Sequence, residues 1–162
     1  MSFEASKKLE REVAKLVKSY PQKRSASLMV LHAIQEEAGY ISRDAELWAA
    51  EKLDLNPINI HELVTFYPML REHDPGKTVI RVCRTLSCAL AGSHKLHDHI
   101  CQKLGLEKES GGLKRTKDGK FGVEYAECLA SCGTGPVMMC NDDFYEGVSN
   151  EEAEGILKKY DN

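Results

Sequence analysis

The 162-residue sequence lacks the long apolar segments that membrane insertion or export requires. No stretch approaches the roughly 20 apolar residues of a membrane-spanning helix, and no apolar run near the N-terminus is long enough for a signal peptide. We therefore expect a cytoplasmic protein without direct membrane insertion. Because cytoplasmic thiols stay reduced, the 6 cysteines are expected to serve metal or redox chemistry and not a disulfide framework.

Several binding and catalytic signatures are also missing. There is no Gly-x-Gly-x-x-Gly motif after a strand and no P-loop, so the chain is not expected to bind NADH or another nucleotide by itself. A dithiol redox enzyme would use a Cys-x-x-Cys motif, which does not occur. The net charge of −3 is spread evenly along the chain, without the basic excess typical of nucleic-acid binders.

The first half of the chain contains no cysteine and has the apolar periodicity of amphipathic helices. The predicted helices run from about Leu9 to Tyr20, from about Ser25 to Ala38, from Ser42 onward and from Asn56 toward Pro68. A turn or short linker is predicted at His73–Lys77. We therefore expect residues 1–77 to form a helical bundle.

The pattern changes after this linker, where the β-branched run Thr78–Val82 predicts a strand that ends at Cys83. The later expected elements are a helix at about Ala91–Leu104, a hairpin turning at Lys117–Lys120, strands at Pro136–Cys140 and Phe144–Tyr145, and a helix at Glu151–Tyr160 opened by a capping box at Ser149. The fold class is therefore α/β, with a small α/β domain at residues 78–162 behind the helical bundle.

Four cysteines form two short pairs, Cys83-x4-Cys88 and Cys128-x3-Cys132, which 39 residues separate. Cysteine thiolates hold iron–sulfur clusters in sets of four, so each pair could bind one iron of a [2Fe–2S] cluster. Structural zinc also takes four thiolates in short pairs, although Cys-x-x-Cys is its commoner spacing. Unligated buried cysteines are the third alternative. Spacing alone leaves iron–sulfur and zinc in competition.

The remaining candidate metal ligands are predicted to be structural. Cys101 lies late in a predicted helix and Cys140 at a strand end, and both are expected to be packing residues. His94, His97 and His99 cluster on the helix that follows Cys88. We expect these histidines to form a solvated surface, because four cysteines already complete a site.

The segments around the cysteines offer groups that could tune a bound cluster. Gly133 and Gly135 follow the last cysteine of the two pairs, and we expect them to supply backbone freedom and amide hydrogen bonds to sulfur. Thr85 and Ser87 offer hydroxyls for the same purpose. Glu127 would lower the reduction potential if it lies close to the cluster, because reduction adds a negative charge.

The two cysteine pairs followed by Gly135-Pro136 resemble the thioredoxin-like [2Fe–2S] ferredoxin family. The helical half is similar to the N-terminal region of the E subunits of NADH:quinone oxidoreductases in the segments Arg24–Leu28, Gly39–Ile41 and Val64–Tyr67. One position departs from the family pattern, which often has glycine two residues after the third cysteine. Here that residue is Ala130, which is expected to crowd the loop without removing a ligand. The Gly135–Pro136 bond is a candidate for the cis isomer.

The resemblance implies a thioredoxin-like fold for residues 78–162 and one [2Fe–2S] cluster whose cofactor-binding and metal-ligating residues are Cys83, Cys88, Cys128 and Cys132. It implies an electron-transfer subunit of an NADH dehydrogenase complex, respiratory complex I, with no complete active site on this chain. The expected partner is the flavin- and NADH-binding subunit, in the peripheral arm of a membrane-bound complex. The alternatives are the equivalent subunit of an NAD-linked hydrogenase or formate dehydrogenase, and a zinc-stabilised interaction module.

The helical half is expected to dock the partner. Its most apolar surface candidate is the segment Thr65–Leu70. This segment would serve either docking or ordinary packing between the two halves of the chain.

Overall fold

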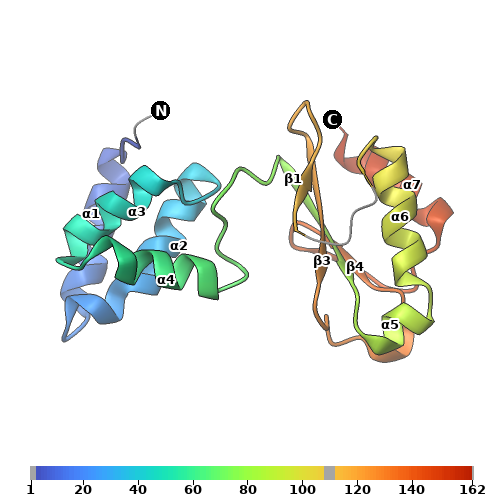
Figure 1. The fold of residues 1–162 in the computed structure, drawn as a ribbon, viewed down its shortest axis with the longest axis horizontal. Helices are drawn as coiled ribbons and strands as arrows, with labels where there is room; N and C mark the ends of the chain where they lie inside the picture. Colours follow the sequence, from blue (N-terminus) through green and yellow to red (C-terminus); the bar gives the residue numbers. More distant parts are fainter. Residues whose placement is uncertain (1–2, 108–111, 162) are drawn as a thin grey trace. The chain divides into compact units, whose positions relative to one another are not determined.

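The computed structural model describes residues 3–107 and 112–161, and the chain divides into two compact units, Met1–Asp74 and Pro75–Asn162 (Figure 1). The first unit is helical, and the second contains a five-stranded sheet with helices. The division falls inside the expected linker segment at residues 73–77. No helix among the described residues is long and apolar enough to cross a membrane.

Four α-helices build the first unit: α1 (Lys7–Ser19), α2 (Ser27–Ala38), α3 (Arg43–Leu53) and α4 (Pro57–Phe66). The hydroxyls of Ser6 and Ser42 accept backbone amide hydrogen bonds at the starts of α1 and α3. Gly39 ends α2 in the left-handed region at φ +82°, as its position predicted. The expected start of α2 at Ser25 is wrong, because residues 23–26 form a separate 3-10 turn.

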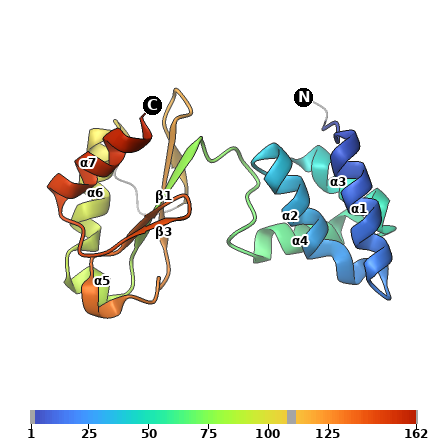
Figure 2. The same ribbon diagram turned by 180° about the vertical axis from the view of Figure 1, so that it is seen from behind.

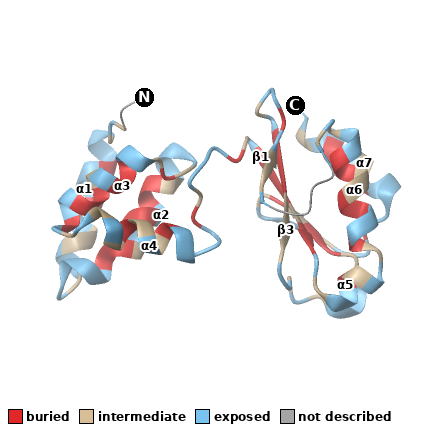
Figure 3. Cartoon of the chain, viewed as in Figure 1, coloured by how far each residue is buried: buried red, intermediate tan, exposed pale blue. Residues whose placement is uncertain are grey.

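The helices of the first unit pack their apolar stripes around one core, shown in red in Figure 3. Leu9 and Val13 of α1, Leu31 and Ile34 of α2 and Ile60 of α4 are all almost fully buried. These side chains recur at three- and four-residue spacings because that is the period of one helix face. The predicted helical bundle therefore has its own hydrophobic core.

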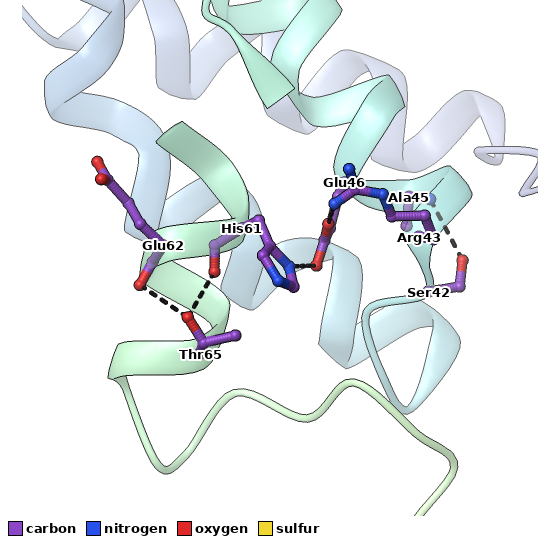
Figure 4. A network of polar contacts seen from close by, with 7 residues as sticks. All are labelled: Ser42, Arg43, Ala45, Glu46, His61, Glu62 and Thr65. Atoms are coloured by element: carbon purple, nitrogen blue, oxygen red, sulfur yellow. Dashed lines mark hydrogen bonds and ion pairs between the residues drawn. The ribbon is translucent and has the colours of Figure 1, made fainter. Parts of the chain in front are cut away.

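A buried carboxylate joins two of these helices. Glu46 of α3 is 2% exposed, and one of its oxygens lies 3.0 Å from Nδ1 of His61 on α4. Its other oxygen accepts a 2.5 Å hydrogen bond from the Arg43 guanidinium, and Figure 4 shows the His61 ring directed at Glu46. Glu72 also brings an oxygen within 4.8 Å of the ligand atoms of Glu46 and His61. Both Glu46 oxygens already have partners, as burial of a charge requires.

The expected apolar surface segment has a mixed environment. Phe66 is 77% exposed, and Tyr67 and Met69 are also exposed, whereas Leu70 is buried in the helical core. The Phe66 and Tyr67 rings contact each other edge to face at a centroid distance of 5.1 Å. Three large apolar side chains of this segment therefore stay accessible on the first unit.

The second unit is built on one mixed sheet. Its strands are β1 (Thr78–Cys83), β2 (Lys114–Arg115), β3 (Phe121–Ala126), β4 (Met138–Cys140) and β5 (Asp143–Tyr145), in the spatial order β2-β3-β1-β4-β5. Strands β1 and β3 are parallel, and the other neighbours are antiparallel. The expected hairpin is confirmed, since Lys114 pairs with Val123 across the turn at Lys117–Lys120.

The described residues of this unit also form three α-helices: α5 (Leu86–Leu90), α6 (Ser93–Lys103) and α7 (Asn150–Tyr160). Helices α6 and α7 lie on the same face of the sheet (Figures 1 and 2), where their apolar residues share a core with Ile80 and Val82 of β1. The predicted capping box of α7 is present, with Ser149 and Glu152 bonding each other's backbone amides. Cys101 and Cys140 are buried in the same core, which confirms their packing role.

The sequence did not predict one helix of this unit, and the expectation for its histidines is wrong. Helix α5 was not expected, because five residues are too few to reveal a helical period. The histidines do not form a uniform solvated surface. His94 is exposed, but His97 is 2% exposed and stacks on Tyr125 with the ring centroids 3.8 Å apart. Burial, followed by the nearby charge of Lys114, lowers the pKa of His97.

Candidate metal centre

The sheet topology brings the two cysteine pairs to one place. Cys83 is the last residue of β1 and lies beside Ala126, the last residue of β3. Because these strands are parallel, their carboxyl ends meet at the same edge of the sheet. Cys128 follows two residues beyond the end of β3. One cysteine of each pair is therefore delivered to the same sheet edge.

The second cysteine of each pair comes from a short helical turn at this edge. Cys88 lies on α5, and Cys132 begins the 3-10 helix η2 (Cys132–Thr134). Helix α5 and η2 contact each other, and they meet at the lower end of the sheet in Figure 1. Cys132 lies close enough to Cys88 for its charge to contribute to the raised pKa of the Cys88 thiol. The structure thus assembles the four predicted site cysteines.

The two pairs differ in exposure. Cys83 is 1% exposed and Cys88 is 2% exposed, and both pack with Val137 and the partly buried Leu129. Cys128 and Cys132 are exposed. A cofactor held by all four sulfurs would therefore have one shielded end and one end facing solvent.

Hydrogen bonds favour the thiolate of Cys83. The Thr85 hydroxyl oxygen lies 3.2 Å from its Sγ atom. Burial raises the pKa of the Cys83 thiol, but the Thr85 hydroxyl and the Leu129 and Thr85 amides outweigh burial and hold the pKa below its usual value. Its neighbour Cys88 has a raised pKa, because burial and then the nearby Cys83 sulfur disfavour a second thiolate.

The exposed pair repeats this asymmetry. The Sγ atoms of Cys128 and Cys132 are 3.7 Å apart, and the Ala130 amide donates to Cys128 Sγ at 3.3 Å. The Ala130 amide, followed by Cys132, lowers the pKa of Cys128, whereas Cys128 raises the pKa of Cys132. Two adjacent thiolates repel each other, so both sulfurs of a pair ionise readily only with a cation between them. Two such pairs fit metal ligation.

Ala130 and Gly135 have unusual backbone geometry in the loop of the exposed pair. Ala130 adopts the left-handed conformation at φ +62°, which explains why a glycine would suit this position. Among the described contacts, the amides of Leu129, Ala130 and Val137 bond to cysteine sulfur. Hydrogen bonds from the Gly133 and Gly135 amides to cluster sulfur stay a prediction. The Gly135–Pro136 bond is cis, as expected.

The lack of a side chain at Gly135 lets the backbone pass close to Cys88. A Cβ atom at this position would lie 3.3 Å from Cys88 Sγ and 3.3 Å from the Ala91 side chain, tighter than most such contacts. The backbone after the exposed pair therefore passes close to the sulfur of the buried pair. A side chain at Gly135 would require the Cys88 and Ala91 side of this contact to shift by a few tenths of an ångström.

An ion pair links the segments that carry Cys83 and Cys128. The Arg84 guanidinium donates to the Glu127 carboxylate through both Nε, at 2.8 Å, and Nη2, and the Arg84 amide bonds to the Ala126 carbonyl at 2.9 Å. Both side chains are exposed. The negative charge of Glu127, expected to lower a cluster potential, is therefore offset by an adjacent positive charge.

The profile of the thioredoxin-like [2Fe–2S] ferredoxins matches residues 13–161, which include the four cysteines and nearly all of both units. The chain belongs to this family. The membership confirms the resemblance and the expected thioredoxin-like α/β fold class, and the family is one of [2Fe–2S] proteins. The assembled cysteine pairs are the group of side chains that suits such a cofactor.

Curated relatives of this chain belong to a larger enzyme. The E subunit of the NADH-quinone oxidoreductase of Aquifex aeolicus is 34% identical over 158 residues, which cover 98% of this chain and 96% of the relative. The corresponding protein of Rickettsia bellii is 36% identical over 150 residues, which cover 91% and 87% of the two chains. Similarity over nearly the full length of these relatives includes the helical unit.

The fold also occurs in a solved structure. An NAD+-reducing [NiFe]-hydrogenase in the air-oxidized state matches with a TM-score of 0.70 at 19% identity. The match covers 83% of this chain but only 22% of the hydrogenase chain. At this identity the likeness concerns the fold alone.

Sequence reasoning missed several contacts at the site. Thr85 was expected from its position between cysteines, but the amides of Leu129 and Val137 carry no signal in their side chains. Glu146 was also missed, although its carboxylate accepts hydrogen bonds from the hydroxyls of Ser131 and Thr134. Its separation of 14 residues from Cys132 along the chain hid this contact.

Proposed function

We propose that Cys83, Cys88, Cys128 and Cys132 are the ligands of one [2Fe–2S] cluster, with one pair on each iron. The observation that carries this proposal is the common edge of the parallel strands β1 and β3, which assembles one buried and one exposed pair. In each pair one thiol has a lowered pKa and its sulfur raises the pKa of the other thiol. A cation between the two sulfurs would remove that conflict.

The spacing of the sulfurs favours two irons over a single zinc ion. Tetrahedral zinc with Zn–S bonds of about 2.3 Å places all four sulfurs roughly 3.8 Å from one another. Among the described residues, no three cysteine sulfurs lie within 4.8 Å of one another. The only described group of three or more His, Cys, Asp or Glu residues whose ligand atoms are that close is Glu46, His61 and Glu72. Two separated pairs suit a binuclear cluster better than a mononuclear site.

The chain is an electron-transfer subunit of an NADH-quinone oxidoreductase, in line with its family and curated relatives. A bound [2Fe–2S] cluster supplies a centre that accepts and returns one electron. The chain itself binds the irons through thiolates, shields the buried pair from water and supplies hydrogen bonds to sulfur from Thr85, Leu129 and Ala130. These contacts and the local charges set the reduction potential.

The electron partner in this proposal is the flavin- and NADH-binding subunit of the same complex, within the peripheral arm. Hydride chemistry needs a cofactor that this chain has no motif to bind. The exposed side chains Phe66, Tyr67 and Met69, here called the aromatic patch, supply a docking surface on the helical unit. Exposed apolar side chains that lie against each other, as the Phe66 and Tyr67 rings do, are typical of interaction sites.

Metal and sulfide analysis of the purified full-length chain tests the cluster. The expected result is a red-brown protein with equal amounts of iron and acid-labile sulfide, which bleaches with dithionite and gives an EPR signal when reduced. A colourless protein with stoichiometric zinc would contradict the proposal. Substitution of each ligand cysteine should abolish or alter the signal, whereas Cys101→Ser should leave the EPR signal unchanged.

Binding of the purified flavin subunit tests the aromatic patch. The double variant Phe66→Glu, Tyr67→Glu should lose binding while keeping its cluster and its helical circular dichroism. Leu47→Glu is the matched control, because Leu47 is an exposed apolar residue of α3 outside the patch. Equal binding by the double variant and the wild type would exclude the patch from the interface.

A further inference from the structure

The exposed cysteine pair lies in a segment with little regular structure. Between the end of β3 at Ala126 and the start of β4 at Met138, the only described element is the three-residue η2 helix. Cys132 begins that helix, between Ser131 and Thr134. Other contacts must therefore fix the position of the Cys132 sulfur relative to its partners.

A single carboxylate supplies such contacts from a different part of the chain. Oε1 of Glu146, in the loop after β5, accepts hydrogen bonds from the Ser131 hydroxyl and from the Thr134 hydroxyl, the latter at 2.5 Å. The two hydroxyl oxygens are themselves 2.8 Å apart. The three polar groups thus form a closed cluster around the backbone that carries Cys132.

The backbone of the same loop continues this attachment. The Gly147 amide bonds to the Thr134 carbonyl at 2.7 Å, and the Val148 amide bonds to the Pro136 carbonyl at 3.0 Å. The Ser131 hydroxyl, followed by the Thr134 hydroxyl, lowers the pKa of Glu146, so the carboxylate stays charged near neutral pH. Glu146 therefore brings both hydrogen-bond acceptance and a fixed negative charge to the exposed pair.

We propose that Glu146 is the positioning residue of the exposed cysteine pair, holding the segment around Cys132 through the hydroxyls of Ser131 and Thr134 and lowering the cluster potential by its charge. This inference rests on the four-cysteine cluster of the proposed function. Glu146 touches no cysteine in the described contacts and acts through its two hydroxyl partners. Loss of a group bonded directly to a metal ligand typically weakens metal binding by about 10- to 100-fold, and we expect Glu146, one contact further out, to have an effect at the lower end of this range.

Two substitutions separate positioning from charge. Glu146→Ala removes the acceptor and the charge together, whereas Glu146→Gln keeps an Oε1 acceptor for both hydroxyls and removes only the charge. In full-length protein challenged with an iron chelator, Glu146→Ala should lose its cluster about tenfold faster than wild type. Glu146→Gln should release it at nearly the wild-type rate. Both variants should show a more positive midpoint potential, because reduction no longer places the added charge near a carboxylate.

Asp142→Asn is the matched control for charge, because Asp142 is exposed, precedes β5 and makes no hydrogen bond within the described contacts. It should change neither the release rate nor the potential. The double variant Ser131→Ala, Thr134→Val tests whether Glu146 acts through these two hydroxyls. It should release the cluster as fast as Glu146→Ala. Adding Glu146→Ala to that background should then accelerate release no further.

The outcomes distinguish this inference from the proposed function. A wild-type protein without iron and sulfide would reject the cluster itself. If the wild type holds a cluster and the Glu146→Ala variant releases its cluster at the wild-type rate, only the positioning role of Glu146 is rejected. An equal potential shift in Asp142→Asn and Glu146→Gln would reject the specific effect of charge. Circular dichroism of the apoprotein checks that faster release does not come from unfolding.

Discussion

The two cysteine pairs occupy contrasting regions of one site. The buried pair, Cys83 and Cys88, stands at the end of β1 and on α5, where strand pairing and the apolar neighbours Val137 and Leu129 fix the backbone. The exposed pair, Cys128 and Cys132, lies in a segment held by polar side-chain contacts and by the left-handed residue Ala130.

The contrast shows that the four proposed ligands are positioned by different forces. Burial excludes water from one pair, so its geometry depends on packing and on the sheet. The other pair depends on hydrogen bonds in contact with solvent, which are individually weak. We expect the buried pair to be the more rigid half of the site. We expect the exposed pair to be the half where solvent can replace a cysteine ligand and where nearby residues change the reduction potential.

The largest expected difference between the pairs is the response to loss of a ligand. Cys88→Ser should abolish the cluster, because the site is buried and the serine hydroxyl is a poor thiolate substitute. Cys132→Ser should retain part of the cluster with altered absorption and EPR, because solvent can complete the coordination of an exposed iron. Iron and sulfide content measure both effects. Equal loss of iron and sulfide in Cys88→Ser and Cys132→Ser would show that burial does not distinguish the two pairs.

Thiol alkylation of the apoprotein compares the pairs directly. Iodoacetamide should modify Cys128 and Cys132 at least about tenfold faster than Cys83 and Cys88, because the reagent reaches only exposed sulfurs and this access outweighs the lowered pKa of Cys83. Mass spectrometry of the full chain resolves the sites. Cys140 is an internal control that should react slowly, since burial raises its pKa to about 12. Similar rates for all of these thiols would show that the buried pair opens without the cluster.

Replacement of Ala130, the left-handed residue of the exposed segment, should have a smaller effect, on the stability of the chain. Ala130→Gly should stabilise the chain by about 0.5–1 kcal/mol, because relief of roughly 1–2 kcal/mol of backbone strain exceeds the added entropy of the unfolded glycine. Urea unfolding measures the change. Ala91→Gly is the control, since Ala91 follows α5 in an ordinary right-handed conformation and glycine there would only add entropy to the unfolded chain, so its replacement should destabilise. Destabilisation by both substitutions would exclude strain at Ala130.

The smallest expected effects concern the ion pair that joins the two regions. Glu127→Gln should raise the cluster potential and Arg84→Gln should lower it, each by about 10–40 mV, because both side chains are exposed and screened. The double variant should return close to the wild-type potential. Protein film voltammetry at low and high salt measures the shifts. An unchanged potential in Glu127→Gln would remove Glu127 from control of the cluster.

Much of the fold could be predicted because its signals are local. The β-branched run Thr78–Val82, the Asp118-Gly119 turn and the capping box at Ser149 each depend on neighbours a few residues away, and the structure confirms all three elements. The short helix α5 and the burial of His97 could not be predicted in this way. A five-residue helix has no readable period, and burial of one helix face depends on what packs against it.

The sequence by itself determined the chemistry available to this protein. Four thiolates in two short pairs indicate a metal site, which spacing alone leaves open to iron–sulfur or zinc, and the motifs that resemble the thioredoxin-like [2Fe–2S] ferredoxins favour an electron carrier. These inferences follow from residue identity and spacing along the chain, which tertiary contacts do not alter.

Only the tertiary structure decided how the thiolates are presented. The parallel pairing of β1 and β3 brings the segment of Cys128 beside Cys83, although the two cysteines are 45 residues apart along the chain. The same topology buries one pair, exposes the other and places Glu146 beside the hydroxyls that flank Cys132. Burial and through-space charge depend on distances between remote segments, and strand pairing sets those distances.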